Sequence, residues 1–159
     1  QGVAGDPRVI LGPGEYELAG VHIRGIITPP GTGDSPGKRN TAYLVEMEGL
    51  TLCHLGDISQ GLTARQVEDL GTAQILFVPA GGVCTLEAKQ VLEVVNLIAP
   101  KLVVLMHYGV PGLTVALKPV SGFLKEVGIK EVEPQPKLVV TQSNLPQEIR
   151  FVVLQPTPV

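Results

Sequence analysis

The feature that most constrains the fold is an alternation of short aliphatic strands with helix signals, which begins at Leu50. The segments 50–55, 75–79 and 102–106 are apolar runs of the length expected for buried strands. A helix signal follows each of them. Crossover connections of this kind make neighbouring strands parallel, so the three strands are expected to share one carboxyl edge. Sites in α/β proteins lie at that edge.

Capping patterns place the helices between these strands. Thr63 and Gln66 have the spacing of a capping box, which predicts a helix over 63–70. Thr85 is expected to cap a longer helix, and a third helix is predicted over 119–127.

The first part of the chain is predicted to be rich in strands, because strand-forming runs alternate with glycine and proline turns. A hairpin is expected to pair 41–46 with 50–55 around Glu48-Gly49. Further strands are predicted at 9–11, 15–18 and 21–27, and two closing strands at 137–141 and 148–154.

Three segments leave the shared edge, namely Gly56-Asp57, Gly81-Gly82 and His107. A carboxylate oxygen and an imidazole nitrogen are ligands that suit zinc, manganese or iron. Paired glycines allow a ligand to approach the backbone closely, and the helix start that follows them suits an anion. The spacing leaves an alternative equally open for each: a helix cap for Asp57, a hydrogen-bonded loop residue for His107, and a tight turn for the glycines.

The other histidines and the cysteines are weaker candidates. His22 is expected at the surface, and His54 is expected on the strand face opposite to Asp57, in a structural or supporting role. Cys53 and Cys84 lack Cys-x-x-Cys spacing and are predicted to be reduced thiols. The sequence has no Walker A motif and no Gly-x-Ser-x-Gly elbow, which argues against a P-loop protein and a serine hydrolase.

Composition narrows the range of partners. The 159 residues predict a single domain, 1–159, with 12 basic and 15 acidic residues and a net charge of −3. The sequence contains no basic stripe and few aromatic residues, so nucleic acid is not expected as a partner. No apolar run approaches the ~18 residues of a membrane span, so we expect no membrane partner and a cytoplasmic location.

Four motifs together resemble one family, the metallo-β-lactamase-fold hydrolases. They are Leu55-Gly56-Asp57, the PAGGVCT segment at 79–85, Ala99-Pro100-Lys101 and Met106-His107-Tyr108. The branch that includes ascorbate-6-phosphate lactonase, with many bacterial and archaeal metal-dependent hydrolases, matches best. The GPGEY segment at 12–16 and Leu145-Pro146 resemble the same branch, so the resemblance covers nearly the whole chain.

The resemblance implies an α/β fold, an αββα sandwich, with one or two zinc or manganese ions. Asp57 would bridge the metals and act as the catalytic residue, and His107 would be a metal ligand. Gly81, Gly82 and Thr85 would line the pocket for a small-molecule substrate. A metal-activated water would then attack an ester, lactone or phosphoester. The competing expectation is a non-catalytic module that binds a small molecule or serves assembly.

Two parts of the family pattern have no counterpart in this sequence. The first metal motif, His-x-His-x-Asp-His, is missing, and a further ligand histidine expected at 29–33 is replaced by Pro-Pro-Gly-Thr-Gly. Because the chain begins with Gln1, we expect either a fragment of a longer protein or a degenerate member. We also expect a partner subunit or the rest of the protein to cover apolar faces and open edges, which favours a homo-oligomer.

Overall fold

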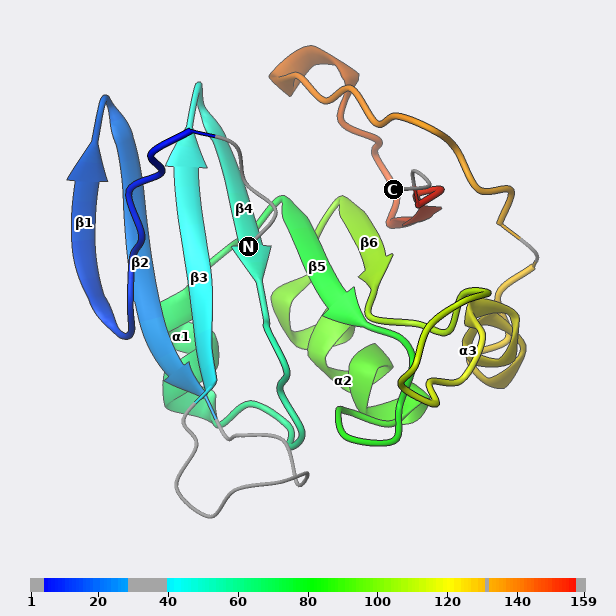
Figure 1. Ribbon diagram of the computed structural model, residues 1–159. Helices are drawn as coiled ribbons and strands as arrows, with labels where there is room; N and C mark the ends of the chain where they lie inside the picture. Colours follow the sequence, from blue (N-terminus) through cyan, green and yellow to red (C-terminus); the bar gives the residue numbers. More distant parts are fainter. Residues whose placement is uncertain (1–4, 29–39, 131, 157–159) are drawn as a thin grey trace.

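A seven-stranded mixed sheet organises the chain (Figure 1). The computed structural model describes residues 5–28, 40–130 and 132–156, and within these ranges the strands lie side by side in sequence order. The strands are β1 (Gly14–Leu18), β2 (Val21–Thr28), β3 (Asn40–Met47), β4 (Leu50–His54), β5 (Ile75–Pro79), β6 (Leu102–Met106) and β7 (Arg150–Val153). The helices are α1 (Ala64–Leu70), α2 (Ala88–Ile98) and α3 (Val120–Glu126), with a 3-10 turn, η1, at Gln142–Asn144.

The first four strands are antiparallel, and two-residue turns join two of the pairs. Ala19-Gly20 connects β1 to β2, and Glu48-Gly49 connects β3 to β4. All four turn residues have positive φ, between 49° at Glu48 and 78° at Gly20. Such turns have the twist that paired strands require, and glycine adopts them without strain. The predicted hairpin around Glu48-Gly49 is therefore confirmed.

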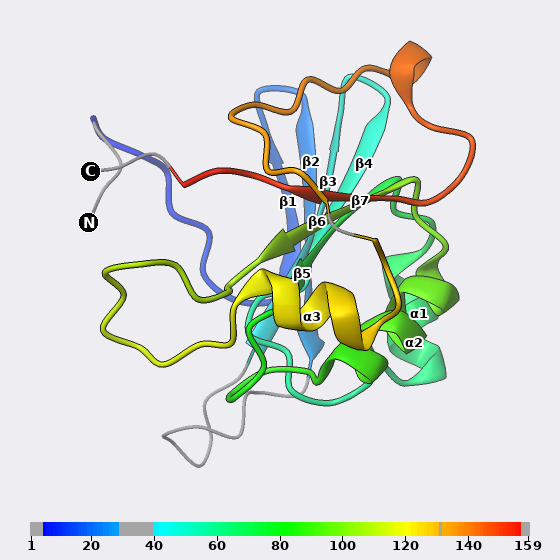
Figure 2. The same cartoon turned by 90° about the vertical axis from the view of Figure 1, so that its right-hand side faces the viewer.

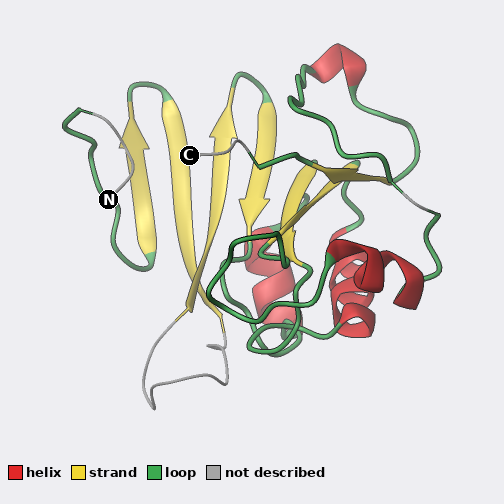
Figure 3. Cartoon of the chain, turned by 45° about the vertical axis from the view of Figure 1, so that its right-hand side comes forward, coloured by secondary structure: helices red, strands yellow, loops and turns green. Residues whose placement is uncertain are grey.

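The strands from β4 to β7 are parallel, as the alternation of strands and helices predicts. All three helices pack on one face of the sheet, which Figures 2 and 3 show from two sides. Because side chains alternate along a strand, Leu76 and Val78 of β5 and Val103 and Leu105 of β6 face these helices and are buried. The helices bury Leu70, Val91, Val94, Val95, Ile98, Phe123 and Leu124 against them.

The face of the sheet that lies away from the helices has its own smaller core. Ile75, Leu102, Val104 and Val152 are buried there. The segment 132–149 crosses this side of the sheet before the chain enters β7 (Figure 2). It packs Leu138, Val140 and Leu145 on these strands.

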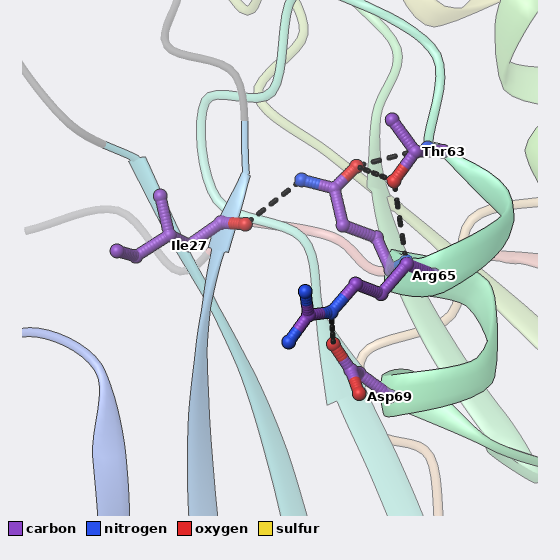
Figure 4. Close-up of polar contacts among 5 residues, drawn as sticks. Ile27, Thr63, Arg65 and Asp69 are labelled. Carbon is purple, nitrogen blue, oxygen red and sulfur yellow. Dashed lines mark hydrogen bonds and ion pairs between the residues drawn. The ribbon is translucent and has the colours of Figure 1, made fainter.

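Helix α1 is fixed at its start by a side-chain network (Figure 4). The Gln66 backbone N–H donates to Thr63 Oγ1 at 3.3 Å, and the Thr63 backbone N–H donates to Gln66 Oε1 at 2.9 Å. This is the predicted capping box. Gln66 Nε2 also donates to the carbonyl of Ile27 at 2.8 Å, which links the helix to β2. The helix has only seven residues, and this hydrogen bond attaches it to the sheet.

Three expectations about secondary structure are wrong. Residues 9–11 form no strand. The backbone here bonds a side chain and not a neighbouring strand: the Tyr43 hydroxyl accepts the Gly12 N–H at 3.1 Å and donates to the carbonyl of Ile10 at 3.4 Å. Residues 137–141 form no strand either, because β7 pairs with β6 and this segment lies across the sheet face instead. Thr85 does not cap α2, whose N-cap is Glu87.

Among the described residues, every helix falls short of the length or apolar character that crossing a membrane requires. The segment 29–33, where the family pattern places a further ligand histidine, lies outside the described residues.

Candidate functional site

The predicted convergence at one sheet edge is confirmed in its topology. Strands β4, β5 and β6 are parallel, with Leu52 paired to Ile75 and Phe77 to Val104. The segments that follow them therefore leave the sheet at the same edge. Asp57 follows β4, Gly81-Gly82 follows β5, and His107 follows β6.

Backbone contacts connect these three loops. The N–H of Leu86 donates to the carbonyl of Ile58 at 2.9 Å, which joins the loop after β5 to the loop of Asp57. The Lys118 N–H donates to the carbonyl of Gly81 at 3.0 Å. A Cβ at Gly81 would overlap the carbonyl oxygen of His107, so the backbones of Gly81 and His107 touch only because Gly81 has no side chain. The loop after β5 is thus in contact with both of its neighbours.

Asp57 is exposed and lies at the rim of the edge. Its backbone N–H donates to Oδ1 of Asn40 at 3.0 Å. This bond holds the main chain of Asp57 and does not use its carboxylate. Among the contacts of the described residues, no hydrogen bond or ion pair joins Asp57 to His107. The structure brings the two to one edge without bringing them into contact.

His107 has two features that a loop histidine rarely combines. Its φ is 51°, in the left-handed region that non-glycine residues seldom adopt. Its Nδ1 is buried and has no hydrogen-bond partner among the residues that the structure describes. A buried nitrogen without a partner costs about 1–3 kcal/mol, so such atoms in native structures call for a ligand, a water or a functional explanation. His107 therefore carries an imidazole nitrogen, a type of atom that binds metals, and the described residues leave this nitrogen without a hydrogen bond.

The donor types fit a divalent metal, but the donor count in the described residues is short. Asp57 offers an oxygen and His107 a nitrogen, which suit zinc or manganese. Catalytic zinc sites use three protein ligands. Within 5–28, 40–130 and 132–156, no group of three or more His, Cys, Asp or Glu side chains is placed to hold an ion. Asp57 and His107 can therefore be two members of a ligand set, not the whole of it.

The turn after β5, residues 81–85, has a strained backbone and is held by a hydrogen bond within the turn. Val83 has a φ of 65°, an outlier for a β-branched residue. Thr85, 7% exposed, uses its hydroxyl to donate to the carbonyl of Gly82 at 3.3 Å. Its hydroxyl thus stabilises the turn and does not cap the helix. Strained residues of this kind gather at functional sites, at a cost of order 1–3 kcal/mol each.

His54 supports the backbone next to Asp57. Its ring stacks on Phe77, with the ring centres 5.9 Å apart, and its Nδ1 accepts the Gly56 N–H at 3.1 Å. Desolvation lowers the pKa of His54 below its usual value, and the charge of Asp57 partly offsets that effect. A neutral imidazole keeps the lone pair that this hydrogen bond needs. His22 is exposed, as the sequence predicts. Its Nδ1 lies 3.9 Å from Oε2 of Glu17.

The two cysteines are unpaired and differ in burial. Burial raises the pKa of the Cys53 thiol to about 12. Cys53 therefore stays protonated and serves as a small apolar residue of the core. Cys84 is half-buried in the turn after Gly82.

Sequence reasoning missed two polar residues near the edge, Asn40 and Lys118. The Nζ of Lys118 lies 3.0 Å from Glu87 Oε2, and this hydrogen bond raises the pKa of Lys118. Its chain passes over Gly82, so a residue from the loop after β6 reaches the start of α2. No local motif marks Lys118. Asn40 had a usable signal, because the two-residue turn at Glu48-Gly49 sets the register that places it opposite Asp57.

Comparisons with known proteins identify the family and the fold. A family model described as a beta-lactamase superfamily domain matches residues 1–107. A protein named as a metal-dependent hydrolase in Carboxydothermus hydrogenoformans is 32% identical over 102 residues, which are 60% of this chain and 44% of that protein. The solved structure of a metallo-β-lactamase superfamily protein from Thermotoga maritima matches with a TM-score of 0.78 and 35% identity, over 92% of this chain and 71% of that one.

A more distant solved structure extends the likeness in fold. Igni18, a metallo hydrolase from Ignicoccus hospitalis, matches with a TM-score of 0.55 and 21% identity, over 89% of this chain and 55% of that one. The match to the Carboxydothermus relative covers 44% of that protein, so the chain spans less than half of its length.

Proposed function

Because the chain belongs to the beta-lactamase superfamily domain family and has the metallo-β-lactamase fold, we propose that it is part of a metal-dependent hydrolase whose ion is bound through Asp57 and His107. Family membership implies a divalent metal ion. We propose zinc or manganese, as one or two ions. The proposed substrate is a small ester, lactone or phosphoester.

One observation carries this proposal: within 5–28, 40–130 and 132–156, the buried Nδ1 of His107 lacks a partner at the edge where Asp57 also lies. The protein holds His107 in a strained conformation, with its carbonyl packed on Gly81. His107 would hold a metal through its imidazole nitrogen, and Asp57 would hold it through its carboxylate. Both residues keep donor atoms that suit one cation.

A bound divalent metal supplies a water that is acidic enough to act as a nucleophile near neutral pH. The chain's own residues hold the site around it. Asp57 would contribute a carboxylate oxygen at the rim, and His107 would contribute an imidazole nitrogen. Gly81 and Gly82 are buried against His107 and Lys118, and Thr85 keeps their turn in place beside His107 through the carbonyl of Gly82. We propose these three residues as the substrate-binding turn.

The first experiment measures metal content in the full-length protein that contains this chain, after purification with Zn²⁺ or Mn²⁺. We expect stoichiometric metal in the wild type and at least a tenfold loss of affinity in Asp57→Ala and His107→Ala. Matched controls are Asp69→Ala and His22→Ala, which remove an exposed carboxylate and an exposed imidazole far from the edge. Hydrolysis of p-nitrophenyl acetate, a γ-lactone and p-nitrophenyl phosphate by the loaded protein then separates the three substrate classes.

The competing function is a non-catalytic module, and the short ligand set of the described residues favours it. Folded full-length protein that contains no metal, and whose small-molecule binding is unchanged in Asp57→Ala and His107→Ala, would reject the hydrolase and leave this second function.

Partners and location belong to the same proposal. We expect a small-molecule substrate and a second copy of the chain, with neither nucleic acid nor membrane as a partner. The net charge of −3 argues against nucleic acid as a partner. The unpaired cysteines support a cytoplasmic location. Light scattering of the purified chain tests the homo-oligomer.

A further inference from the structure

The carboxamide of Asn40, the first residue of β3, makes three hydrogen bonds at the site edge. Its Oδ1 accepts the backbone N–H of Asp57 at 3.0 Å. Its Nδ2 donates to the carbonyl of Leu55 at 2.8 Å and to Oγ1 of Thr28 at 2.5 Å. The oxygen and both hydrogens of the amide are then used, which gives the side chain one orientation.

The register of the sheet explains how Asn40 reaches these partners. Asn40 pairs with Thr28 of β2 on one side, and Tyr43 pairs with His54 of β4 on the other. Asn40 lies three residues before Tyr43, and Asp57 lies three residues after His54, so the same antiparallel register, continued past the end of β4, places Asn40 opposite Asp57. The carboxamide therefore spans from β2 to the segment that follows β4.

Gly56 provides the space that the Asn40 side chain fills. A Cβ at Gly56 would overlap Oδ1 of Asn40, and the φ of 64° at Gly56 lies in the left-handed region. Glycine alone meets both demands without strain. The turn before Asp57 is thus shaped around the carboxamide.

We propose that Asn40 is the positioning residue for Asp57, and its importance for metal binding rests on the proposed function. Asn40 binds the backbone amide of Asp57 and not its carboxylate, so it sets where the side chain leaves the sheet while the carboxylate oxygens remain for the ion. Thr28, 1% exposed, holds the carboxamide from the other side. Groups that orient a metal ligand typically change metal affinity by 10–100-fold.

The test compares Asn40→Ala with the wild type by two measurements on the full-length protein that contains this chain. The first is hydrogen exchange of the Asp57 amide in metal-free protein, which we expect to accelerate by about five- to tenfold when its acceptor is removed. The second is titration with Co²⁺, followed by visible absorption, in which we expect the dissociation constant to rise by about 10–100-fold. A residue that only supports the overall fold would not single out the Asp57 amide.

Gln142→Ala is the matched control. Gln142 Nε2 donates to the carbonyl of Gly49 at 2.9 Å, so it holds the opposite end of the same β3–β4 pair. We expect this variant to leave the exchange of Asp57 and the Co²⁺ affinity unchanged. Thr28→Val removes one support of the carboxamide within the buried strand and should shift both measurements in the same direction as Asn40→Ala, by less. It keeps the test decisive if Asn40→Ala does not fold.

The outcomes separate this inference from the proposed function. Wild-type exchange and Co²⁺ affinity in a folded Asn40→Ala, or in Thr28→Val if Asn40→Ala does not fold, would overturn the positioning role. A wild type that binds no Co²⁺ would overturn the proposed function instead, and faster exchange at Asp57 in Asn40→Ala would still uphold Asn40 as its positioning residue.

Discussion

Gly81 shows how one residue position couples two loops of the site. The sequence indicates two uses for the glycine pair, close approach of a ligand to the backbone or a tight turn. In the structure, the close approach at Gly81 is internal, because the backbone oxygen of His107 occupies the space of a side chain. The carbonyl of Gly81 also receives the N–H of Lys118. Gly81 therefore ties the loop after β5 to the candidate metal ligand.

We predict that Gly81→Ala lowers the free energy of unfolding by about 2 kcal/mol or more, since the new Cβ must displace backbone atoms. Urea unfolding measures the change. Gly61→Ala is the matched control, because a Cβ there meets nothing within 4 Å, and it should change stability by less than about 0.5 kcal/mol. Equal stability of the two variants would mean that the loops are not packed in this way.

At the scale of elements, α1 illustrates a helix that depends on its ends. Its seven residues are too few for stability in isolation. The Thr63–Gln66 capping box satisfies backbone groups at its start, and Gln66 also bonds the carbonyl of Ile27. The capping box was predictable from a local pattern of four residues. The bond to Ile27 was not, because it joins residues 39 positions apart.

We predict that Thr63→Ala lowers the free energy of unfolding by about 1 kcal/mol, the usual cost of losing an N-cap. Gln66→Ala should cost more, because it removes both the cap partner and the bond to β2. Arg65→Ala on the same helix provides the control: its exposed contact with Asp69 at 4.0 Å should contribute less than about 0.5 kcal/mol. Thermal unfolding of the three variants ranks them, and a Thr63→Ala variant as stable as wild type would contradict the prediction.

At the scale of the whole molecule, the sheet is covered unequally on its two faces. The three helices bury one face, whereas the segment 132–149 supplies the cover for β5 to β7 on the other. Leu138 and Val140 of that segment pack on the sheet, while Val139 between them is 61% exposed. The alternation resembles that of a strand, which is why the sequence predicts one at 137–141. The side chains pack on the sheet, but the backbone does not join it.

We predict that Val140→Asp lowers the free energy of unfolding by about 2 kcal/mol or more, since it places a charge against the apolar sheet face. Val139→Asp, one residue away and pointing to solvent, should change it by less than about 0.5 kcal/mol. Urea unfolding monitored by circular dichroism distinguishes the pair. If both substitutions were tolerated, the segment would not be part of the fold's core.

The sequence by itself determined the features that depend on neighbouring residues. The Glu48-Gly49 turn, the capping box at Thr63 and the aliphatic runs of β5 and β6 all follow from local conformational preferences. The parallel order of β4, β5 and β6 follows from the chirality of crossover connections, and it brings Asp57 and His107 to one edge. The family resemblance of the motifs around these residues is also confirmed by the comparisons.

Only the tertiary structure decided which groups meet. Thr85 bonds the carbonyl of Gly82 rather than capping α2, because Glu87 already occupies the cap position. Asn40 reaches Asp57 through a contact between segments far apart in the chain. The Nδ1 of His107 is likewise buried by tertiary packing, without a partner in the described part of the chain. Such contacts arise when loops pack against each other, and they leave no periodic pattern in the sequence.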